Sequence, residues 1–196
     1  MFNSGKSVAE LITELRDEVD IALEIPTSTY LVWLNSIEQL CYSEIIKEQR
    51  EITIANPTHT ILLTSLTVSE DEAPVRFEDI YAVYADGVQL MKTTLASGRI
   101  FPDTYYKQMD DLGLNLPYMT KELKVIYFVR PKIKTSEEGN VMMPIEFIDL
   151  VKAKMRGEAY KLVNEDALAG KWINDYNVLL ETFKVWCNNK ASQFGM

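Results

Sequence analysis

The sequence predicts an α+β fold, a four-helix bundle with a small antiparallel β-sheet inserted between the second and third helices. Apolar residues recur with helical spacing before residue 50 and again after residue 143. Between these parts the apolar residues alternate with a period near two, and β-branched and aromatic residues are frequent there. Such a chain buries its apolar faces most simply when the flanking helices close around one another and the sheet forms an insertion.

The N-terminal helical pair is expected within residues 1–50. Ser7 and Glu10 have the spacing of a capping box, and the apolar residues that follow share one helical face. Pro26 interrupts this pattern, and the threonines and serine after it offer N-cap residues for a second helix. The second helix is predicted to continue to about Lys47.

The β-rich insertion is expected to span residues 51–135. Strands are predicted at its alternating segments, which are Glu51–Ala55, Thr60–Val68, Ile80–Tyr84, Val88–Met91 and Lys121–Arg130. The Asp86-Gly87 pair is a strong signal for a tight hairpin between the third and fourth of these strands. Residues 94–120 show no regular period and are predicted to form a loop with one helical turn at Asp103–Met109.

A C-terminal helical hairpin is expected over residues 136–188, followed by an extended tail over residues 189–196. Pro144 is well tolerated at a helix start, and the last helix is predicted to run from about Glu165 to Asn188. Large apolar residues at helical spacing predict that this helix packs on the third one. They are Leu168, Trp172, Tyr176, Leu179, Phe183 and Trp186.

The charge and the apolar pattern restrict the possible partners. The formal net charge is −9, without clustered Lys and Arg, which argues against tight wrapping of nucleic acid. DNA that slides through a channel without being gripped remains compatible with an acidic surface. No stretch reaches the roughly 20 apolar residues that span a bilayer, so a cytosolic protein without membrane contact is expected.

The residues that commonly carry catalysis or bind metals are sparse. His59 is the only histidine and is expected at the surface, whereas Cys41 and Cys187 lie in apolar helical patterns and are expected in the core. The acidic clusters are expected to face water as loop charges: Glu70–Glu72, Asp110–Asp111 and Glu137–Glu138. We therefore expect a protein that is not an enzyme, with no catalytic residue, no metal and no cofactor.

Two stretches carry a family resemblance. Val8–Ile12 and Leu15–Asp17 precede Tyr30–Asn35, whose Trp-Leu-Asn sequence opens the second helix. Val125–Lys132 ends in Arg-Pro-Lys and is followed after a polar turn by Met143–Phe147. In this order the motifs resemble those of the head-to-tail adaptor proteins of tailed bacteriophages, also described as connector, head-completion or tail tubular A-type proteins.

This resemblance implies a structural virion protein in the neck, at the head-tail interface, after synthesis in the host cytoplasm. Such adaptors form a ring, usually of twelve copies, on the portal protein of the head, and this homo-oligomer joins the portal to the next tail or neck protein. Double-stranded DNA would pass through the channel without specific binding. The family's C-terminal segment commonly reaches into the portal, and the residues expected to anchor there are Trp186, Phe194 and Met196.

One segment does not follow the family pattern. Tyr105–Pro117 departs from the family's usual glycine-asparagine strand pair.

Several alternatives remain at this point. A tail-completion or tail-terminator protein is one alternative, although such proteins are typically α/β with fewer terminal helices. An intracellular protein-binding module is another, and it would stay a monomer or dimer in every context. An enzyme would require loss of a specific activity when His59 or Asp110 is changed.

Overall fold

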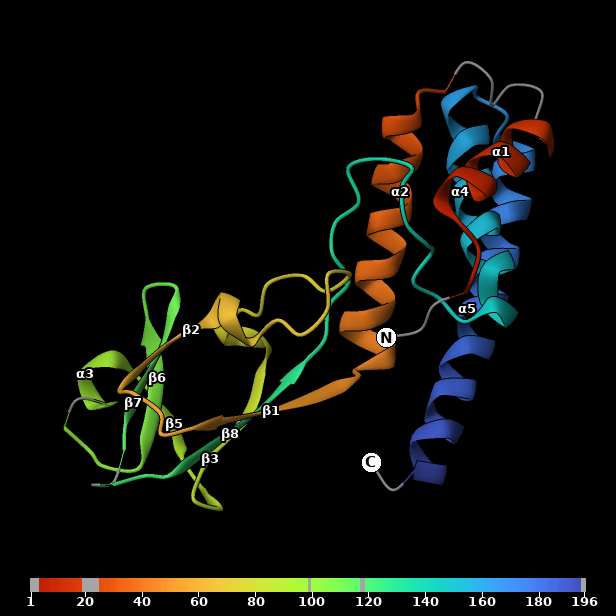
Figure 1. Cartoon of the computed structure of the whole chain (residues 1–196). Coiled ribbons are helices and arrows are strands. Elements are labelled where there is room, and N and C mark those ends of the chain that lie inside the picture. The colour runs from red at the N-terminus through yellow and green to blue at the C-terminus, as the bar shows by residue number, and fades with distance from the viewer. Residues whose placement is uncertain (1–3, 19–24, 99, 117–118, 195–196) are drawn as a thin grey trace. The chain divides into compact units, whose positions relative to one another are not determined.

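The computed structural model describes residues 4–18, 25–98, 100–116 and 119–194, with side chains to residue 190 (Figure 1). The chain divides into two compact units. Unit 1 comprises residues 1–46 and 133–196, and unit 2 comprises residues 47–132. Unit 2 is thus an insertion in sequence, and its ends lie within a few residues of the expected boundaries at 51 and 135.

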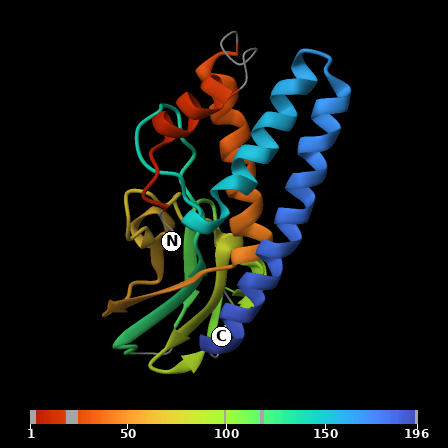
Figure 2. The same ribbon diagram turned by 90° about the vertical axis from the view of Figure 1, so that its right-hand side faces the viewer.

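Unit 1 is helical. Its elements are α1 (Val8–Glu18), α2 (Thr27–Leu40), the π-helix η2 (Cys41–Ile46), the 3-10 helix η5 (Ile145–Phe147), α4 (Ile148–Leu162) and α5 (Asp166–Phe194). The capping box of α1 is confirmed, since the Ser7 amide donates to Glu10 Oε2 at 3.0 Å and the Glu10 amide donates to Ser7 Oγ at 3.1 Å. Figure 2 shows α4 and α5 side by side as an antiparallel hairpin.

The apolar faces of these helices meet in one core. Gly157 of α4 allows a close approach to α5, because a Cβ there would lie 2.9 Å from Ile173 Cγ1. The α5 stripe packs as predicted at Tyr176 and Phe183, which are buried, whereas Leu168 is exposed. Among the core residues that are less than 2% exposed are Val8, Leu11, Ile12, Leu15, Tyr30, Leu34, Leu150, Val151, Met155 and Phe183.

The C-terminal end differs from the prediction. The expected helix end at Asn188 and the expected extended tail over 189–196 are wrong for residues 189–194, because α5 continues as a helix to Phe194. Helix formation does not require an apolar stripe, and the sequence Asn-Lys-Ala-Ser-Gln contains no proline or glycine that would end it. Loss of apolar periodicity after Trp186 therefore did not mark the end of the helix.

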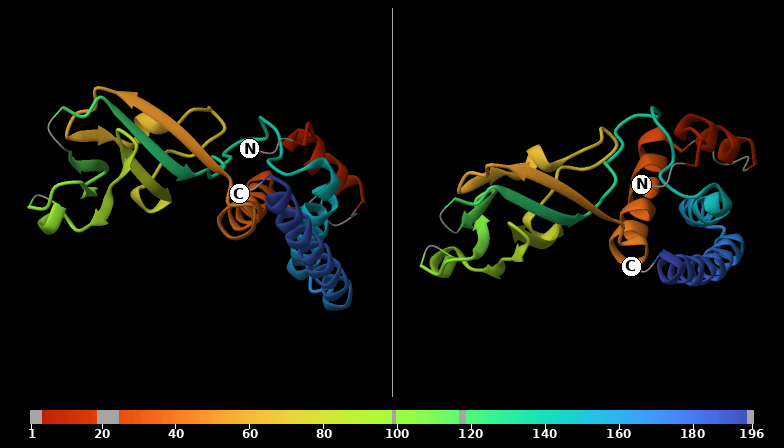
Figure 3. Two further views of the ribbon diagram at one scale, coloured as in Figure 1. Left: turned by 90° about the horizontal axis from the view of Figure 1, so that it is seen from below. Right: turned by 60° about the horizontal axis from the view of Figure 1, so that its bottom comes forward.

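Unit 2 is built from two four-stranded sheets. Its strands are β1 (Gln49–Ala55), β2 (Thr60–Leu62), β3 (Ile80–Ala85), β4 (Val88–Gln89), β5 (Met91–Thr93), β6 (Thr104–Gln108), β7 (Asp111–Asn115) and β8 (Glu122–Phe128). Its short helices are η3 (Leu63–Leu66), η4 (Phe77–Asp79) and α3 (Leu95–Gly98). The strand orders are β1-β8-β3-β4 and β2-β7-β6-β5. Figure 3 shows β1, in orange, running beside β8, in green.

The chain passes from the first sheet to the second between β4 and β5. The predicted hairpin is confirmed, with Asp86 and Gly87 at positive φ between β3 and β4. The Leu90 amide then donates to Val83 O at 2.8 Å, and the Met91 amide donates to Asp103 O at 2.9 Å as β5 begins. Because β4 and β5 belong to different sheets, they join the two sheets at one side and leave β1 and β2 as edge strands.

The predicted fold class is therefore wrong. The described part of the chain has five α-helices and two four-stranded sheets, not a four-helix bundle with one small antiparallel sheet. The second sheet also contains a parallel pair, β5 with β6. In addition, the predicted strand Thr60–Val68 is a strand only to Leu62 and continues as η3.

Most of the missing sheet lies in residues 94–120. The predicted loop is wrong here, because it contains β6 and β7, and the predicted helical turn at Asp103–Met109 is wrong because Thr104–Gln108 is strand β6. Thr104, Tyr105 and Tyr106 are all buried, so β6 lacks the alternation of a strand with one wet face. The Tyr106 ring lies against Gly98 of α3 and Gly113 of β7, where added Cβ atoms would come within 2.0 Å and 2.3 Å of it. A tyrosine that fills the space of two glycines leaves no regular pattern in the sequence.

Candidate interaction surfaces

An aromatic cluster marks the place where α5 leaves the core of unit 1. Phe147, immediately before α4, contacts Phe183 and Trp186 of α5 at ring-centroid distances of 4.7 Å and 5.3 Å. Phe183 is fully buried, whereas Trp186 is only partly buried. The Lys190 ammonium lies 4.5 Å from the centroid of the Trp186 ring, as in a cation–π contact.

Beyond this cluster α5 projects past its partner helix. Phe183 and Trp186 are level with the start of α4, because both contact Phe147. From Trp186 the helix continues for eight residues to Phe194, which corresponds to about 12 Å. Figure 2 shows this end of α5 extending beyond the first turn of α4.

The three predicted anchor residues have different positions. Trp186 lies at the base of the projecting end and also contributes to the core of its own unit. Phe194 is the last helical residue, and its side chain lies outside the described part, as does Met196. The structure therefore places one of the three side chains.

A buried carboxylate fastens the segment that leads back toward α4. Glu38 of α2 is fully buried, accepts from the Met142 amide at 2.7 Å and forms an ion pair with Lys134. One turn earlier, Asn35 binds both the amide and the carbonyl of Lys134, at 2.8 Å and 2.9 Å. Burial raises the pKa of Glu38, and Lys134 and the Met142 amide oppose this shift only in part.

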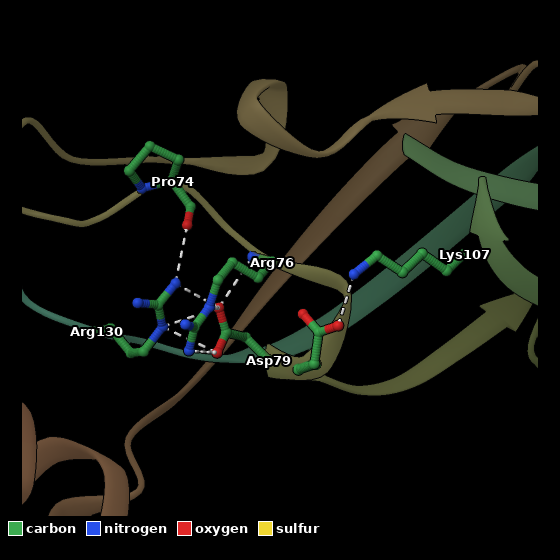
Figure 4. Close-up of polar contacts among 6 residues, drawn as sticks. Pro74, Arg76, Asp79, Lys107 and Arg130 are labelled. Carbon is green, nitrogen blue, oxygen red and sulfur yellow. Dashed lines mark hydrogen bonds and ion pairs between the residues drawn. The ribbon is translucent and has the colours of Figure 1, made fainter. Parts of the chain in front are cut away.

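Unit 2 contains a second buried carboxylate, drawn in Figure 4. Arg130 Nε lies 2.9 Å from both oxygens of Asp79, and Arg130 Nη2 donates to Asp79 Oδ2 at 2.8 Å. The backbone amide of Arg76 adds a bond of 2.9 Å, and Arg130 also reaches Pro74 O at 3.2 Å. This arrangement fastens the η4 turn to the end of β8 and leaves the carboxylate saturated with donors, which is typical of a structural ion pair.

Unit 2 has a candidate surface of its own around α3, which the sequence did not reveal. Thr104 Oγ1 donates to Gly98 O and Phe101 O, and Asn115 Nδ2 also donates to Phe101 O at 2.9 Å. These bonds hold Gly98 and Phe101, and four large apolar side chains are exposed on α3, on β5 or just after α3: Met91, Leu95, Ile100 and Phe101. Exposed apolar groups on a fixed backbone are suited to protein contact, because little order must be gained on binding.

The residues considered for catalysis are scattered. His59 is exposed at the entry to β2, and Asp110 is exposed in the turn before β7. Glu70 and Asp71 are exposed as predicted, but the expectation for Glu72 is wrong, because this carboxylate is buried and lies 3.2 Å from Arg50 Nη1. Within the described ranges no group of three or more His, Cys, Asp or Glu side chains could hold a metal ion.

The two cysteines occupy unit 1. Cys41 is buried in η2 and Cys187 is half-buried in α5, and both are free thiols. Burial raises the pKa of Cys41 to about 12 and that of Cys187 to about 11, so both thiols stay protonated at neutral pH. They have the character of packing residues.

Comparisons with known proteins leave the family open. No protein-family model matches the chain, and no curated protein matches it. Among the described residues, no helix combines the length and the apolar character that crossing a membrane requires.

Proposed function

We propose that this chain is a structural virion protein, a subunit of the ring that joins the portal of a tailed-phage head to the tail and extends the DNA channel. The sequence motifs described above motivate this proposal. Its partners would be further copies of the chain in the ring, the portal protein and the next neck or tail protein. Double-stranded DNA would pass along the acidic ring without being gripped.

The projecting end of α5 is the observation that carries the proposal. Helical residues gain most of their stability in proteins from packing, and an isolated helix of two turns is marginal in water. The last eight residues of α5 extend past the α4 start and carry one basic residue, Lys190. A partner that covers this end would add packing beyond the Phe147 cluster, and in the proposed ring that partner is the portal.

The division into two units supports a joining role. Unit 1 has an apolar helical core, and unit 2 has buried apolar residues of its own in both sheets, among them Val83 and Val125 in one and Leu112 and Leu114 in the other. Each unit therefore has a buried interior and an exposed surface of its own. The exposed apolar stretch around α3 provides unit 2 with a candidate contact separate from the end of α5.

Truncation of α5 tests the proposal. Deletion of residues 191–196 should leave the circular dichroism spectrum and thermal unfolding almost unchanged, because the described residues among them, 191–194, follow the Phe147 cluster on α5. The same deletion should abolish co-sedimentation with purified portal rings. The matched control is Val178→Asp, which changes a side chain that is 60% exposed on the part of α5 beside α4 and should retain binding.

The outcome is decisive in either direction. If the full chain sediments with the portal and the truncated chain does not, the portal contact lies at the end of α5. If the full chain fails to bind portal rings, or if the truncated chain binds equally well, the proposed role of this helix end is wrong.

A further inference from the structure

The two edge strands of unit 2 differ in whether their outward hydrogen-bonding groups are available. In β2, Ile61 pairs with Leu112, and the Leu114 amide donates to His59 O at 2.8 Å. Because hydrogen-bonded residues alternate along an antiparallel pair, the backbone amides and carbonyls of Thr60 and Leu62 point outward from the edge of the sheet. Both of their carbonyls are already bound, Thr60 O by Thr58 Oγ1 at 2.6 Å and Leu62 O by Ser65 Oγ at 2.7 Å. The β2 edge is therefore blocked by its own side chains.

The β1 edge is open. The Val129 amide bonds Glu48 O at 2.9 Å and the Asn56 amide bonds Lys121 O at 2.7 Å, so the even-numbered residues of β1 bond to β8. The odd-numbered residues then direct their amides and carbonyls outward, and β1 is the outermost strand of its sheet. These outward residues are Gln49, Glu51, Thr53 and Ala55.

The features that normally protect an edge are missing from β1. It contains no proline, and its pairing with β8 shows no register shift over seven residue pairs. Both of its charges are neutralised within unit 2, since Glu51 pairs with Lys124 at 2.8 Å and Arg50 with Glu72 at 3.2 Å. An incoming strand would therefore meet no net charge.

The core is also incomplete along this edge. Leu123, Val125 and Tyr127 of β8 form the inner row of the sheet and are at most 1% exposed. The β1 residues opposite them, including Ile52 and Ile54, are only half-buried. One further strand beside β1 would cover these isoleucines.

We propose that β1 pairs with β1 of a second copy of this chain, antiparallel and about a two-fold axis at Ile52. The remaining edge strands are blocked or too short, because β4 and β5 have two and three residues. Among the strands that the structure describes, β1 alone therefore offers a long open edge to its copy. In the register that overlaps all seven residues, Gln49 faces Ala55, Glu51 faces Thr53, and Arg50 faces Ile54. No like charges are opposed, whereas a slip that centres Glu51 would place two glutamates opposite one another.

This pairing is isologous, so it closes as a dimer and cannot repeat around a ring. It describes the free chain and does not rest on the proposed function. A ring would use other surfaces, and the failure of one proposal would leave the other standing.

A cysteine pair tests the register. Ile52 would lie opposite its own copy at a non-hydrogen-bonded position, with Cα atoms about 4.5 Å apart, which a disulfide can bridge. Ile52→Cys should therefore form a disulfide-linked dimer almost completely under mild oxidation. Ile54→Cys is the matched control from the same half-buried row, and its two copies would lie about 13 Å apart and should not cross-link. The native thiols contribute little background, since burial holds the pKa of both well above neutral pH.

Sedimentation with proline variants provides the second measurement. The unaltered chain should sediment as a dimer, and Thr53→Pro should convert it to a monomer, because it removes an outward amide without a bond to β8. Thr60→Pro removes an outward amide from the blocked edge and should leave the dimer intact. A monomeric unaltered chain, or equal cross-linking of the two cysteine variants, would overturn the proposal. The open edge would then have to be covered by something other than a second copy, such as a strand from another protein.

Discussion

Each unit contains a buried carboxylate, and the two carboxylates are bound in different ways. In unit 1, Glu38 is fully buried and relies on one lysine and one backbone amide. In unit 2, Asp79 is 7% exposed and is bound by two guanidinium groups, one of which, Arg76, is itself largely exposed. If Lys134 is lost, Glu38 keeps the Met142 amide but loses the cation that pairs with it. If Arg130 is lost, Asp79 keeps the guanidinium of Arg76.

The comparison shows that burial and redundancy determine how much a charge contact contributes. A buried charge without its partner retains its desolvation cost, whereas an ion near the surface regains water. We therefore expect unit 1 to depend strongly on the Glu38 contact and unit 2 to tolerate partial loss of the Asp79 contacts. The predictions below test this difference.

Removal of the Glu38 partner should have the largest effect. Lys134→Met leaves the carboxylate buried without its cation and should lower the free energy of unfolding by about 3–5 kcal/mol at neutral pH. Urea unfolding followed by far-ultraviolet circular dichroism measures the loss, because this signal reports on both units whereas all three tryptophans, Trp33, Trp172 and Trp186, lie in unit 1. Lys124→Met is the matched control, because it breaks the exposed pair with Glu51 and should change stability far less. Equal losses in the two variants would contradict the role of burial.

Changes at Asp79 should cost less. Arg130→Lys removes the planar fork that binds both oxygens, and a loss of about 1–3 kcal/mol is expected. Arg76→Lys should have a smaller effect, because its side chain is exposed and its backbone amide still binds Asp79. The same unfolding measurement decides the order, and a greater loss at Arg76 would show that the redundancy is misassigned.

The packing around Tyr106 extends the comparison from charge to shape. Gly98→Ala should destabilise unit 2 by about 1–3 kcal/mol, because the new methyl group must displace the tyrosine ring. Gly170→Ala in α5 meets nothing within 4 Å and should stabilise its helix by up to about 1 kcal/mol. Thermal unfolding distinguishes the opposite signs, and a neutral Gly98→Ala variant would mean that the ring moves freely.

The smallest expected effect is a slope of stability with pH. Burial raises the pKa of Glu38, so the folded chain retains this proton at pH values where the unfolded chain has lost it. The contribution of Glu38 to stability therefore falls as pH rises from its unfolded pKa through its folded pKa. Stability compared between the unaltered chain and Glu38→Gln across this window isolates the effect, and identical slopes would exclude it.

The sequence predicted the helical unit better than the β unit. The capping box at Ser7 and Glu10 and the core stripe of α5 depend on contacts close in sequence or on a regular period, and both can be found by spacing. The number of strands could not be found in this way. The β6 strand is buried at three successive residues, and its fit depends on Gly98 and Gly113, which become neighbours only in the fold.

The candidate surfaces were predictable only in part. Trp186 is the last residue of the predicted apolar stripe, and the structure places it at the base of the projecting α5; its role as an anchor stays a prediction from the family resemblance. The open β1 edge could not be identified, because it depends on which strands pair and on the hydroxyl groups that block β2. Glu38 gave no local signal, since Lys134 lies 96 residues away. Asp79 has a local partner in Arg76, but Arg130 lies 51 residues away and gave no signal.

Electron microscopy of phage particles assembled with and without this chain tests the proposed ring on the portal most directly. The proposal predicts a ring of density beneath the portal in particles that contain the chain, and loss of that ring together with the tail in particles that lack it. Particles with the same neck density and normal tails in both preparations would contradict the proposal.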